Sequence, residues 1–320
     1  MTRSVRVTGG AGFIGSHLVQ ALQARGDAVA IVDNFDKFYP ERLKRRALEP
    51  LLKAGARLFE RDIRDQAGMH EVFAAVRPEV VVHLAALAGV RPSLERPGDY
   101  MDVNVRGTAC VLEAAREAGA RRFVLGSSSS VYGAHAAPPF RETARIDSPE
   151  SPYAASKVAS EVLARTFHNL YGVEVAALRF FTVYGPRQRP DLAIHKFSRK
   201  LLAGEPLPFF GDGSTRRDYT WVEDIVAGVV SACETKLSYE TLNLGGAATT
   251  SLAELVALLE DALGVRAVLD RRPAQPGDVP LTSADVTHSG AVLGYAPRTP
   301  IAAGIKKFAA WIRGEGHDWL

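Results

Sequence analysis

The sequence predicts an α/β protein built on a doubly wound parallel sheet with helices on both faces. Short β-branched runs alternate with helical patterns over the first 180 residues, which is typical of parallel strands joined by crossover helices. Several of these runs are apolar throughout, as expected of strands buried on both sides. A chain of 320 residues is long enough for one large or two modest domains.

The predicted elements follow one another in regular order. Strands are expected at 5–7, 28–32, 56–59, 80–83, 123–125 and 175–178, and helices near 13–25, 41–53, 65–76, 98–117 and 153–171. After residue 180 Gly and Pro become frequent, and helices are expected near 191–203, 221–233, 251–263 and 300–313. We therefore expect one domain in residues 1–180 and a smaller, mostly helical domain in residues 181–320, with some elements crossing over. A site would lie between them, at the carboxyl ends of the strands.

Composition and charge exclude several classes of protein. The net charge of +3 is too small to indicate a nucleic-acid partner. Cys110 and Cys233 are far apart in sequence, so we expect two buried thiols in a reducing compartment rather than a disulfide. The His residues show no metal-ligand spacing with Cys or carboxylates, so no metal is expected. Without an apolar run of 18 residues or a leader segment, the sequence predicts a cytoplasmic protein that does not bind membranes.

A glycine-rich turn between the first strand and the first helix predicts a dinucleotide site. Residues 8–15 read TGGAGFIG, and Asp33 ends the second strand 18 residues after Gly15. Glycines allow a tight turn and close approach to a pyrophosphate at the helix N-terminus. The Asp33 carboxylate can accept hydrogen bonds from both ribose hydroxyls of NAD and would repel the 2′-phosphate of NADP. This pattern predicts a Rossmann-type domain that binds NAD, with contacts from Gly9, Gly12, Phe13, Ile14, Gly15 and Asp33.

A tyrosine and a lysine with the spacing Y-x-x-x-K lie on the helix expected near 153–171. Tyr153 and Lys157 share one face of it, one turn apart. Tyr is a weak base at neutral pH, but a neighbouring ammonium and the positive nicotinamide ring would stabilise its phenolate. The strand before this helix ends in four serines, residues 127–130, one of which could share the substrate's proton. The pair is therefore a candidate catalytic group.

These motifs resemble the extended short-chain dehydrogenase/reductases, the nucleotide-sugar epimerase and dehydratase group. The glycine turn, Asp33, the Y-x-x-x-K pair and the later Arg216-Arg217-Asp218-Tyr219 carry the resemblance, which extends over essentially the whole chain. It implies a UDP-sugar substrate and a catalytic Ser128 assisting Tyr153 and Lys157. Further NAD contacts are expected from Asn34, Asp62, Ile63, Leu84, Ala85 and Ala86; Asp62 could equally be a helix N-cap.

The residues after Ser128 distinguish the reactions found in this group. Its dehydratases carry an Asp-Glu pair after the catalytic Thr, and its decarboxylases carry a Glu in a similar place. This chain has Ser129 and Ser130 there, and neither hydroxyl can act as a general acid or base at neutral pH. The resemblance therefore implies epimerisation at C4 of the sugar through a transient 4-keto intermediate.

The choice of sugar depends on the hydroxyls and one arginine. Thr182, an R-P-D segment that contains Arg189, and the strand-end serines are similar to the UDP-glucuronate 4-epimerases. Ser129, Ser130 and Thr182 could hold the C6 carboxylate, with Arg189 adding positive charge. Four alternatives remain open: a neutral nucleotide-sugar epimerase such as a UDP-glucose 4-epimerase, a decarboxylase, a non-catalytic NAD-binding sensor, and a plain Ser-rich turn.

The resemblance also implies where the rest of the substrate lies. Arg217 matches an arginine that grips the diphosphate, and Asp278 an acid that binds the uridine ribose. Val90 and Arg91 follow the fourth strand and are expected near the sugar. Members of the group commonly form homodimers through the helices that correspond to 98–117 and 153–171, so a homodimer is expected.

Overall fold

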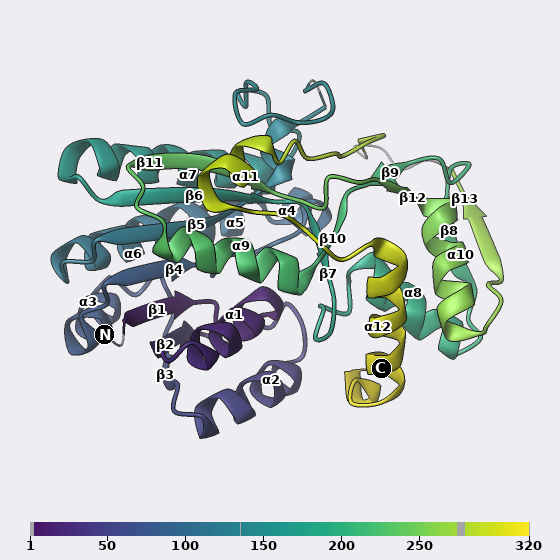
Figure 1. The fold of residues 1–320 in the computed structure, drawn as a ribbon, viewed down its shortest axis with the longest axis horizontal. Coiled ribbons are helices and arrows are strands. Elements are labelled where there is room, and N and C mark those ends of the chain that lie inside the picture. Colours follow the sequence, from purple (N-terminus) through teal and green to yellow (C-terminus); the bar gives the residue numbers. More distant parts are fainter. Residues whose placement is uncertain (1–2, 135, 274–278, 320) are drawn as a thin grey trace.

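The computed structural model describes residues 3–134, 136–273 and 279–319, and a seven-stranded parallel sheet lies at its centre (Figure 1). The strand order is β11-β6-β5-β4-β1-β2-β3, and every adjacent pair is parallel. The strands are β1 (Ser4–Thr8), β2 (Ala28–Asp33), β3 (Arg57–Glu60), β4 (Val80–His83), β5 (Arg122–Ser128), β6 (Glu174–Phe180) and β11 (Tyr239–Leu244). The predicted doubly wound sheet is confirmed.

Helices cover both faces of this sheet, as its apolar strands require. One face carries α1 (Phe13–Ala24), α2 (Glu41–Lys53) and α9 (Val222–Glu234), and the other α3 (Gln66–Val76), α6 (Gly107–Glu117) and α7 (Pro152–Tyr171) (Figure 1). Within β4, Val80 and Val82 join the first apolar layer while Val81 joins the second. Alternate side chains of one strand therefore anchor opposite helix layers.

The helix predicted near 98–117 is interrupted. It comprises α5 (Pro97–Met101), a π-helical turn over Asp102–Arg106, and α6. In the π turn the buried Asn104 side chain accepts from the Leu87 backbone N–H at 2.8 Å and donates to the Leu87 carbonyl at 3.0 Å. A single inserted turn of this kind commonly occurs beside functional sites. It fixes the loop after β4, next to the cavity described below.

The strand β11 was not predicted, although it extends the sheet beyond β6. Its polar residues Glu240, Thr241 and Asn243 hide the usual strand pattern, because β11 forms an edge of the sheet and its first half is only partly buried. The helix that precedes it, α9, packs against α1 on the main sheet. Residues beyond 180 thus contribute to the central sheet and to one of its helix layers.

The remaining C-terminal elements form a second, smaller core. Three two-stranded sheets pair β7 (Thr182–Tyr184) with β10 (Tyr219–Trp221), β8 (Leu207–Phe210) with β13 (Leu269–Arg272), and β9 (Arg216–Arg217) with β12 (Thr250–Ser251). The helices of this core are α8 (Ala193–Leu202), α10 (Leu252–Leu263) and α12 (Ile301–Arg313). The other two short helices belong elsewhere: α4 (Val90–Glu95) packs against α7, and α11 (Thr287–Leu293) packs against β11 and α9. Tyr184, Trp221 and Phe308 are buried where α8, α10 and α12 meet.

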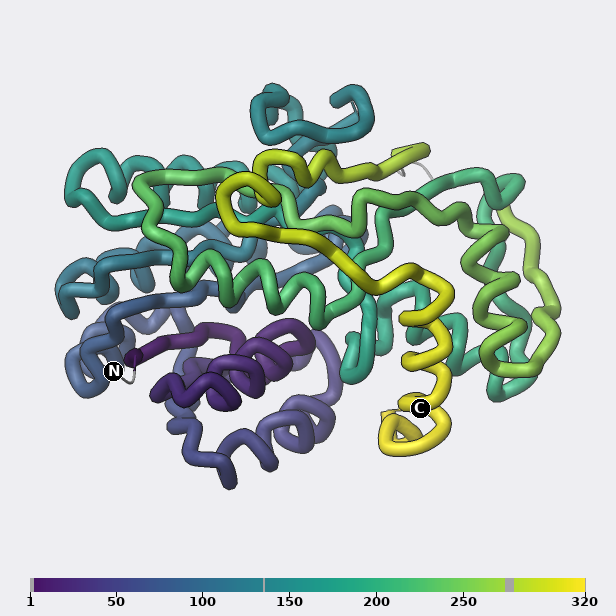
Figure 2. The backbone as a smooth tube through the Cα atoms, in the orientation of Figure 1, coloured from purple at the N-terminus to yellow at the C-terminus, as the bar shows by residue number. Residues whose placement is uncertain are grey.

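The C-terminal segment ties the two cores together. The chain that enters α11 runs back along the sheet before it turns into α12 (Figure 2). Its backbone pairs with the loop after β5, where Phe140 donates to Ser283 at 2.7 Å and accepts from Asp285 at 3.0 Å.

Cys110 and Cys233 are both buried and free, as predicted. In the described ranges no helix has the length and apolar character needed to cross a bilayer.

Candidate active site

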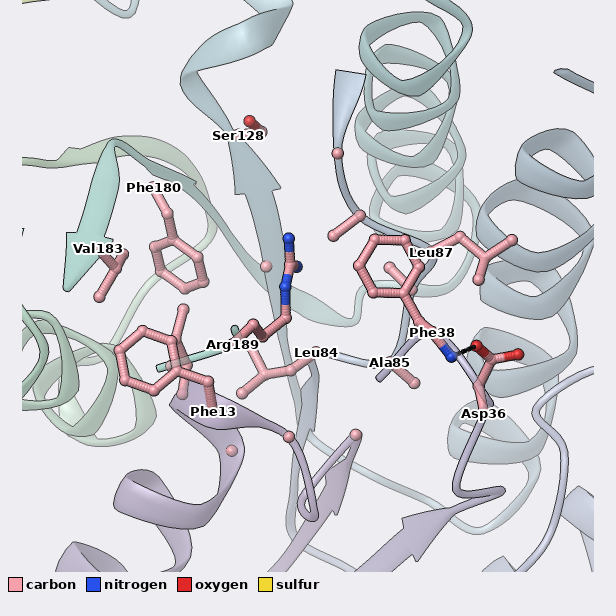
Figure 3. Close-up of a pocket in the computed structure, with 18 of the residues that line it drawn as sticks. Phe13, Asp36, Phe38, Leu84, Ala85, Leu87, Ser128, Phe180, Val183 and Arg189 are labelled. Atoms are coloured by element: carbon pink, nitrogen blue, oxygen red, sulfur yellow. Dashed lines mark hydrogen bonds between the residues drawn. The ribbon is translucent and has the colours of Figure 1, made fainter. Parts of the chain in front are cut away.

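A cavity of about 490 Å³ lies at the carboxyl ends of the strands, where β1, β2, β4 and β5 meet the segment 180–192 (Figure 3). It brings together most of the residues that the sequence predicts for the site. The lining includes Gly9, Gly12, Phe13, Ile14, Gly15, Asp33, Asn34, Ile63, Leu84, Ala85, Ala86, Val90, Ser128, Ser129, Ser130, Tyr153, Lys157, Thr182 and Arg189.

The glycine turn closes one end of the cavity. Gly9 has a positive φ of 71°, and a Cβ there would lie 2.7 Å from the backbone nitrogen of Ala85. A Cβ on Gly15 would overlap the Gly9 carbonyl oxygen. The first helix begins at Phe13 without a side-chain cap, and its first residues Phe13, Ile14 and Gly15 line the cavity. Side chains larger than hydrogen would fill this cradle, whose shape fits a pyrophosphate.

Asp33 is positioned by the turn that it helps to build. Its Oδ2 accepts from the Ala11 N–H at 3.0 Å and its Oδ1 accepts from the Phe35 N–H at 2.9 Å. Each oxygen therefore retains a lone pair for a ribose hydroxyl. Burial raises the pKa of this carboxyl, while the two N–H groups and the nearby Lys44 oppose that shift.

Asp62 does not line the cavity, although Ile63 does. The Asp62 carboxylate accepts from Arg64 at 2.7 Å and from the Asn34 amide at 2.9 Å, and the hydrogen bonds from Arg64 lower its pKa to about 2. It is linked to the cavity through Asn34, which lines it. The alternative that Asp62 is a helix N-cap is wrong, because Asp65 caps α3 by accepting from the Gly68 N–H.

The Tyr–Lys pair projects from the first turns of α7. Ser151 caps this helix by accepting from the Ala154 N–H at 3.1 Å, and the Lys157 ammonium donates to the Gly126 carbonyl at 2.7 Å. Burial lowers the pKa of Lys157 to about 8. Burial raises the pKa of Tyr153, against the lowering expected from its lysine, while a hydrogen bond with Ser128 and the charge of Arg189 act to lower it.

The four serines divide into a strand end and a short helix. Ser127 and Ser128 close β5, and Ser129 opens a 3₁₀ turn over Ser129–Tyr132. Ser128 caps that turn by accepting from the Ser130 N–H at 3.2 Å, and its hydroxyl donates to the Ser130 hydroxyl at 3.1 Å. All four serines line the cavity. They present a row of neutral hydroxyls beside Tyr153.

Arg189 lies in the cavity wall that the segment 180–192 forms. Figure 3 shows its guanidinium beside the ring of Phe38, and the centroid of that ring is 4.9 Å away. Asp191 accepts from Nε at 3.0 Å and from Nη2 at 2.8 Å, a pairing that the sequence did not predict. The positive charge expected from Arg189 is therefore largely balanced, while Nη1 is the group of the fork that is not bonded to Asp191.

Arg91 and Arg217, two further predicted substrate residues, do not line this cavity. Arg91 sits over the ring of Phe210, 5.8 Å from its centroid, and Arg217 donates to the Arg216 carbonyl at 2.9 Å. Asp278 lies outside the described residues. The insert at 38–40 and the start of the next helix were not predicted to belong to the site. The structure brings Phe38, Tyr39 and Lys44 to the cavity wall, where Lys44 donates to the Asp36 carbonyl at 2.6 Å.

The site and fold together define a Rossmann-type enzyme with a Tyr–Lys pair beside a dinucleotide cradle. Residues 5–245 match the model of the NAD dependent epimerase/dehydratase family. The chain therefore belongs to this family.

The chain is similar to relatives with two kinds of substrate in their names. It is 39% identical over 329 residues to UDP-glucuronate 4-epimerase 2 of Arabidopsis thaliana, covering 97% of this chain and 76% of the relative. The structure of UDP-glucuronic acid 4-epimerase from Bacillus cereus, in complex with UDP-glucuronic acid and NAD, superposes with a TM-score of 0.90 at 33% identity (97% and 98% covered). UDP-glucose 4-epimerase of Thermotoga maritima, with UDP-glucose, gives 0.90 at 32% identity (97% and 99% covered).

Proposed function

We propose that this protein is an NAD-dependent isomerase that interconverts UDP-glucuronate and UDP-galacturonate by epimerisation at C4. The observation that carries the proposal is the row of neutral hydroxyls next to Tyr153, with Arg189 in the same cavity. The likeness to the plant and bacterial UDP-glucuronate epimerases supports the same substrate. NAD would be held by the glycine cradle, Asp33 and Asn34, and the nucleotide by residues of the 181–320 part, including Arg217 and Asp278.

The residues of this chain supply the acid–base part of the reaction. NAD, when bound, would supply the hydride acceptor and donor for C4 of the sugar. The phenolic oxygen of Tyr153 takes the proton from the C4 hydroxyl and later gives it back, with the Ser128 hydroxyl sharing that hydrogen bond. The Lys157 ammonium favours the phenolate through its positive charge. The opposite epimer results when the 4-keto sugar turns over between the two transfers, so the site must hold it without locking it.

The hydroxyl row suits a substrate that carries a carboxylate. Oxidation at C4 of a glucuronate gives a β-keto acid, which loses CO₂ when its C5–C6 bond aligns with the carbonyl π system. Ser129, Ser130 and Thr182 can hold the carboxylate away from that alignment and pass it between them as the ring turns. Residues 129 and 130 carry no carboxyl group that could act as an acid or base, which argues against the dehydratase and decarboxylase reactions.

A neutral sugar is the second candidate, because the bidentate pair between Arg189 and Asp191 leaves the cavity with little net positive charge. The acidic and the neutral substrate are distinguished by incubating the purified protein with each UDP-sugar and following the products by proton NMR. UDP-galacturonate formed from UDP-glucuronate, without a pentose product, is the expected result. Conversion of UDP-glucose alone would contradict the assignment of an acidic sugar.

We also propose a cytoplasmic homodimer. Its support is a set of exposed apolar side chains on or next to α7, the helix expected to pair: Val162 and Leu170 are 58% and 65% exposed, and Met101 lies on the neighbouring α5. The buried thiols Cys110 and Cys233 fit a reducing compartment. Light scattering of the purified protein should give twice the chain mass, and Val162→Asp should shift it toward the monomer.

A further inference from the structure

A buried carboxylate lies one helical turn beyond Lys157 on α7. Glu161 is 4% exposed, and Arg179 of β6 donates to its two oxygens, from Nε at 3.0 Å and from Nη2 at 2.8 Å. The Ser127 hydroxyl donates to the same carboxylate. Two charges removed from water in this way are costly unless each is well bonded. This bonded group of Glu161, Arg179 and Ser127 lies one helical turn from Lys157, next to the site.

Three consecutive residues at the end of β5 each bind one polar residue of α7. The Gly126 carbonyl accepts from Lys157, Ser127 donates to Glu161, and Ser128 bonds with Tyr153. The three helix residues are spaced four apart and share one face of α7. Glu161 therefore belongs to the same polar row as the catalytic pair, and it is the member with a negative charge.

The charged and titratable groups around this row come from several elements. Next to Lys157, His83 of β4 is neutral at physiological pH, because burial lowers its pKa to about 3. The hydroxyl of Tyr239 on β11 approaches the Glu161 backbone carbonyl at 3.5 Å. The other groups that face the row are Arg179 with its neighbours Tyr132 and Glu142, Arg165 over the Tyr239 ring, and Arg189 near Tyr153.

Two opposing effects set the pKa of Lys157. Burial lowers the pKa of its ammonium to about 8, and the Glu161 carboxylate is the charge that opposes this shift. Arg179 of β6 donates two hydrogen bonds to that carboxylate. Without the carboxylate, Lys157 would lose its proton at a lower pH, and the phenolate of Tyr153 would lose the cation one helical turn away on α7.

We propose that Glu161, held by Arg179 and Ser127, is a positioning residue that keeps Lys157 charged and directed at the Gly126 carbonyl. This role assigns a function to Ser127, the one serine of the row without a part in the proposed reaction. It rests on the proposed function only in so far as Tyr153 and Lys157 are its catalytic pair.

A second Arg–Glu pair, between β5 and β6, provides a matched control. Arg122 and Glu174 join the first residues of β5 and β6, with Arg122 Nε donating to Glu174 at 2.9 Å. Arg122 is fully buried, as Arg179 nearly is. This pair lies at the opposite end of the strands from Lys157. Glu174→Gln therefore removes a similar ion pair without touching the catalytic row.

The test is the pKa of Lys157, measured by NMR on protein labelled with ¹³C at the lysine ε-carbon and assigned with Lys157→Met. Glu161→Gln should lower this pKa by about one unit or more, and Glu174→Gln should leave it unchanged. The alkaline limb of the kcat–pH profile should move in the same direction in Glu161→Gln alone. An unchanged Lys157 pKa in Glu161→Gln would overturn the proposal.

A double variant separates this role from simple packing. Glu161→Gln with Arg179→Met removes both buried charges, so it should fold even if the single variant leaves Arg179 unpaired and unfolds. The Lys157 pKa should stay below the wild-type value in the double variant. Its return to the wild-type value would contradict the proposal, because the Glu161–Arg179 pair as a whole would then have no net effect on the charge of Lys157. The NMR reading needs no turnover, so it remains decisive if UDP-glucuronate proves not to be the substrate.

Discussion

The two ends of the central sheet use their polar residues in opposite ways. At the amino ends of the strands, Arg3 pairs with Asp27 at 2.9 Å and Arg122 pairs with Glu174, so each charge is bonded within the protein. At the carboxyl ends lie glycines, serines and the Asp33 carboxylate, which keep free lone pairs or open space. The backbone is the same throughout. The end that serves stability bonds its charges within the protein, whereas the end that serves chemistry also leaves some polar groups open to a ligand.

The largest expected effect comes from comparing two variants that each lose one tyrosine hydroxyl, one inside the cavity and one outside it. Tyr153→Phe should reduce turnover by about 10³-fold, because it deletes the proton acceptor, while leaving NAD binding and the melting temperature nearly unchanged. The matched change Tyr132→Phe removes a core hydrogen bond to Asn243 of 2.7 Å outside the cavity. It should cost about 1 kcal/mol of stability and little activity.

Both tyrosine variants are measured by the NMR assay for product, fluorescence titration with NAD, and thermal unfolding. Turnover by Tyr153→Phe within tenfold of the wild type would contradict its assignment as the acid–base residue.

The second prediction compares two glycines at opposite ends of α1. Gly15→Ala places a methyl group on the Gly9 carbonyl oxygen and 2.8 Å from the Gly10 Cα, so the cradle must open. NAD affinity should fall on the order of 100-fold, as expected of a displacement near 1 Å in a binding loop. Gly26, just past the C-terminal end of the helix, has φ 85° and open space around it.

The control Gly26→Ala should therefore lose about 1 kcal/mol of stability from backbone strain and keep its affinity for NAD. Titration calorimetry with NAD measures both variants. Equal loss of affinity in the two would show that α1 responds as a whole and that the cradle is not the specific contact.

Local sequence was enough to predict much of the site but not its supports. The glycine turn, Asp33 and the Tyr–Lys pair depend on spacings within one strand–helix unit, so they could be found without the fold. The pairing of Glu161 with Arg179 depends on which strand lies beside α7, and nothing in the spacing reveals it. The bidentate pair of Arg189 with Asp191 was missed for another reason, because the two residues are near in sequence and only the loop conformation brings them together.

The third prediction concerns the layer directly beneath the cavity. Burial lowers the pKa of His83 to about 3, and its ring lies between the hydroxyls of Thr8 at 2.7 Å and Thr108 at 3.0 Å. In the unfolded chain this histidine binds a proton below about pH 6.5, whereas in the folded protein it stays neutral until the pH falls toward 3. Stability from this group is therefore complete above about pH 6.5 and is lost as the pH falls toward 3.

At pH 5 the loss should be about 2 kcal/mol for this one histidine. Urea unfolding at pH 7.5 and pH 5 measures it, and His83→Gln should show a loss smaller by that amount. An equal loss in wild type and variant would mean that other groups account for the acid sensitivity, such as the half-buried His17, whose pKa is also lowered by desolvation.

The smallest expected effect lies midway between the two ends of the sheet. Arg6 of β1 is fully buried between the rings of Phe59 and Phe73, and it donates to the Val72 carbonyl at 2.8 Å. Unlike Arg3 and Arg122 it has no carboxylate partner, and its Nε and Nη1 form no hydrogen bond within the described residues.

Replacing this cation by a side chain of similar length should therefore stabilise the fold: Arg6→Met is expected to gain about 1 kcal/mol at pH 7 with unchanged activity. Burial lowers the pKa of Arg6 to about 9, so its cost is present below that pH and is relieved as the pH rises above it. The difference between variant and wild type in urea unfolding should accordingly narrow at pH 10. A destabilised variant at pH 7 would mean that the contacts of Arg6 with the two aromatic rings outweigh the cost of burying its charge. Cation–π contacts of this kind strengthen where water is excluded.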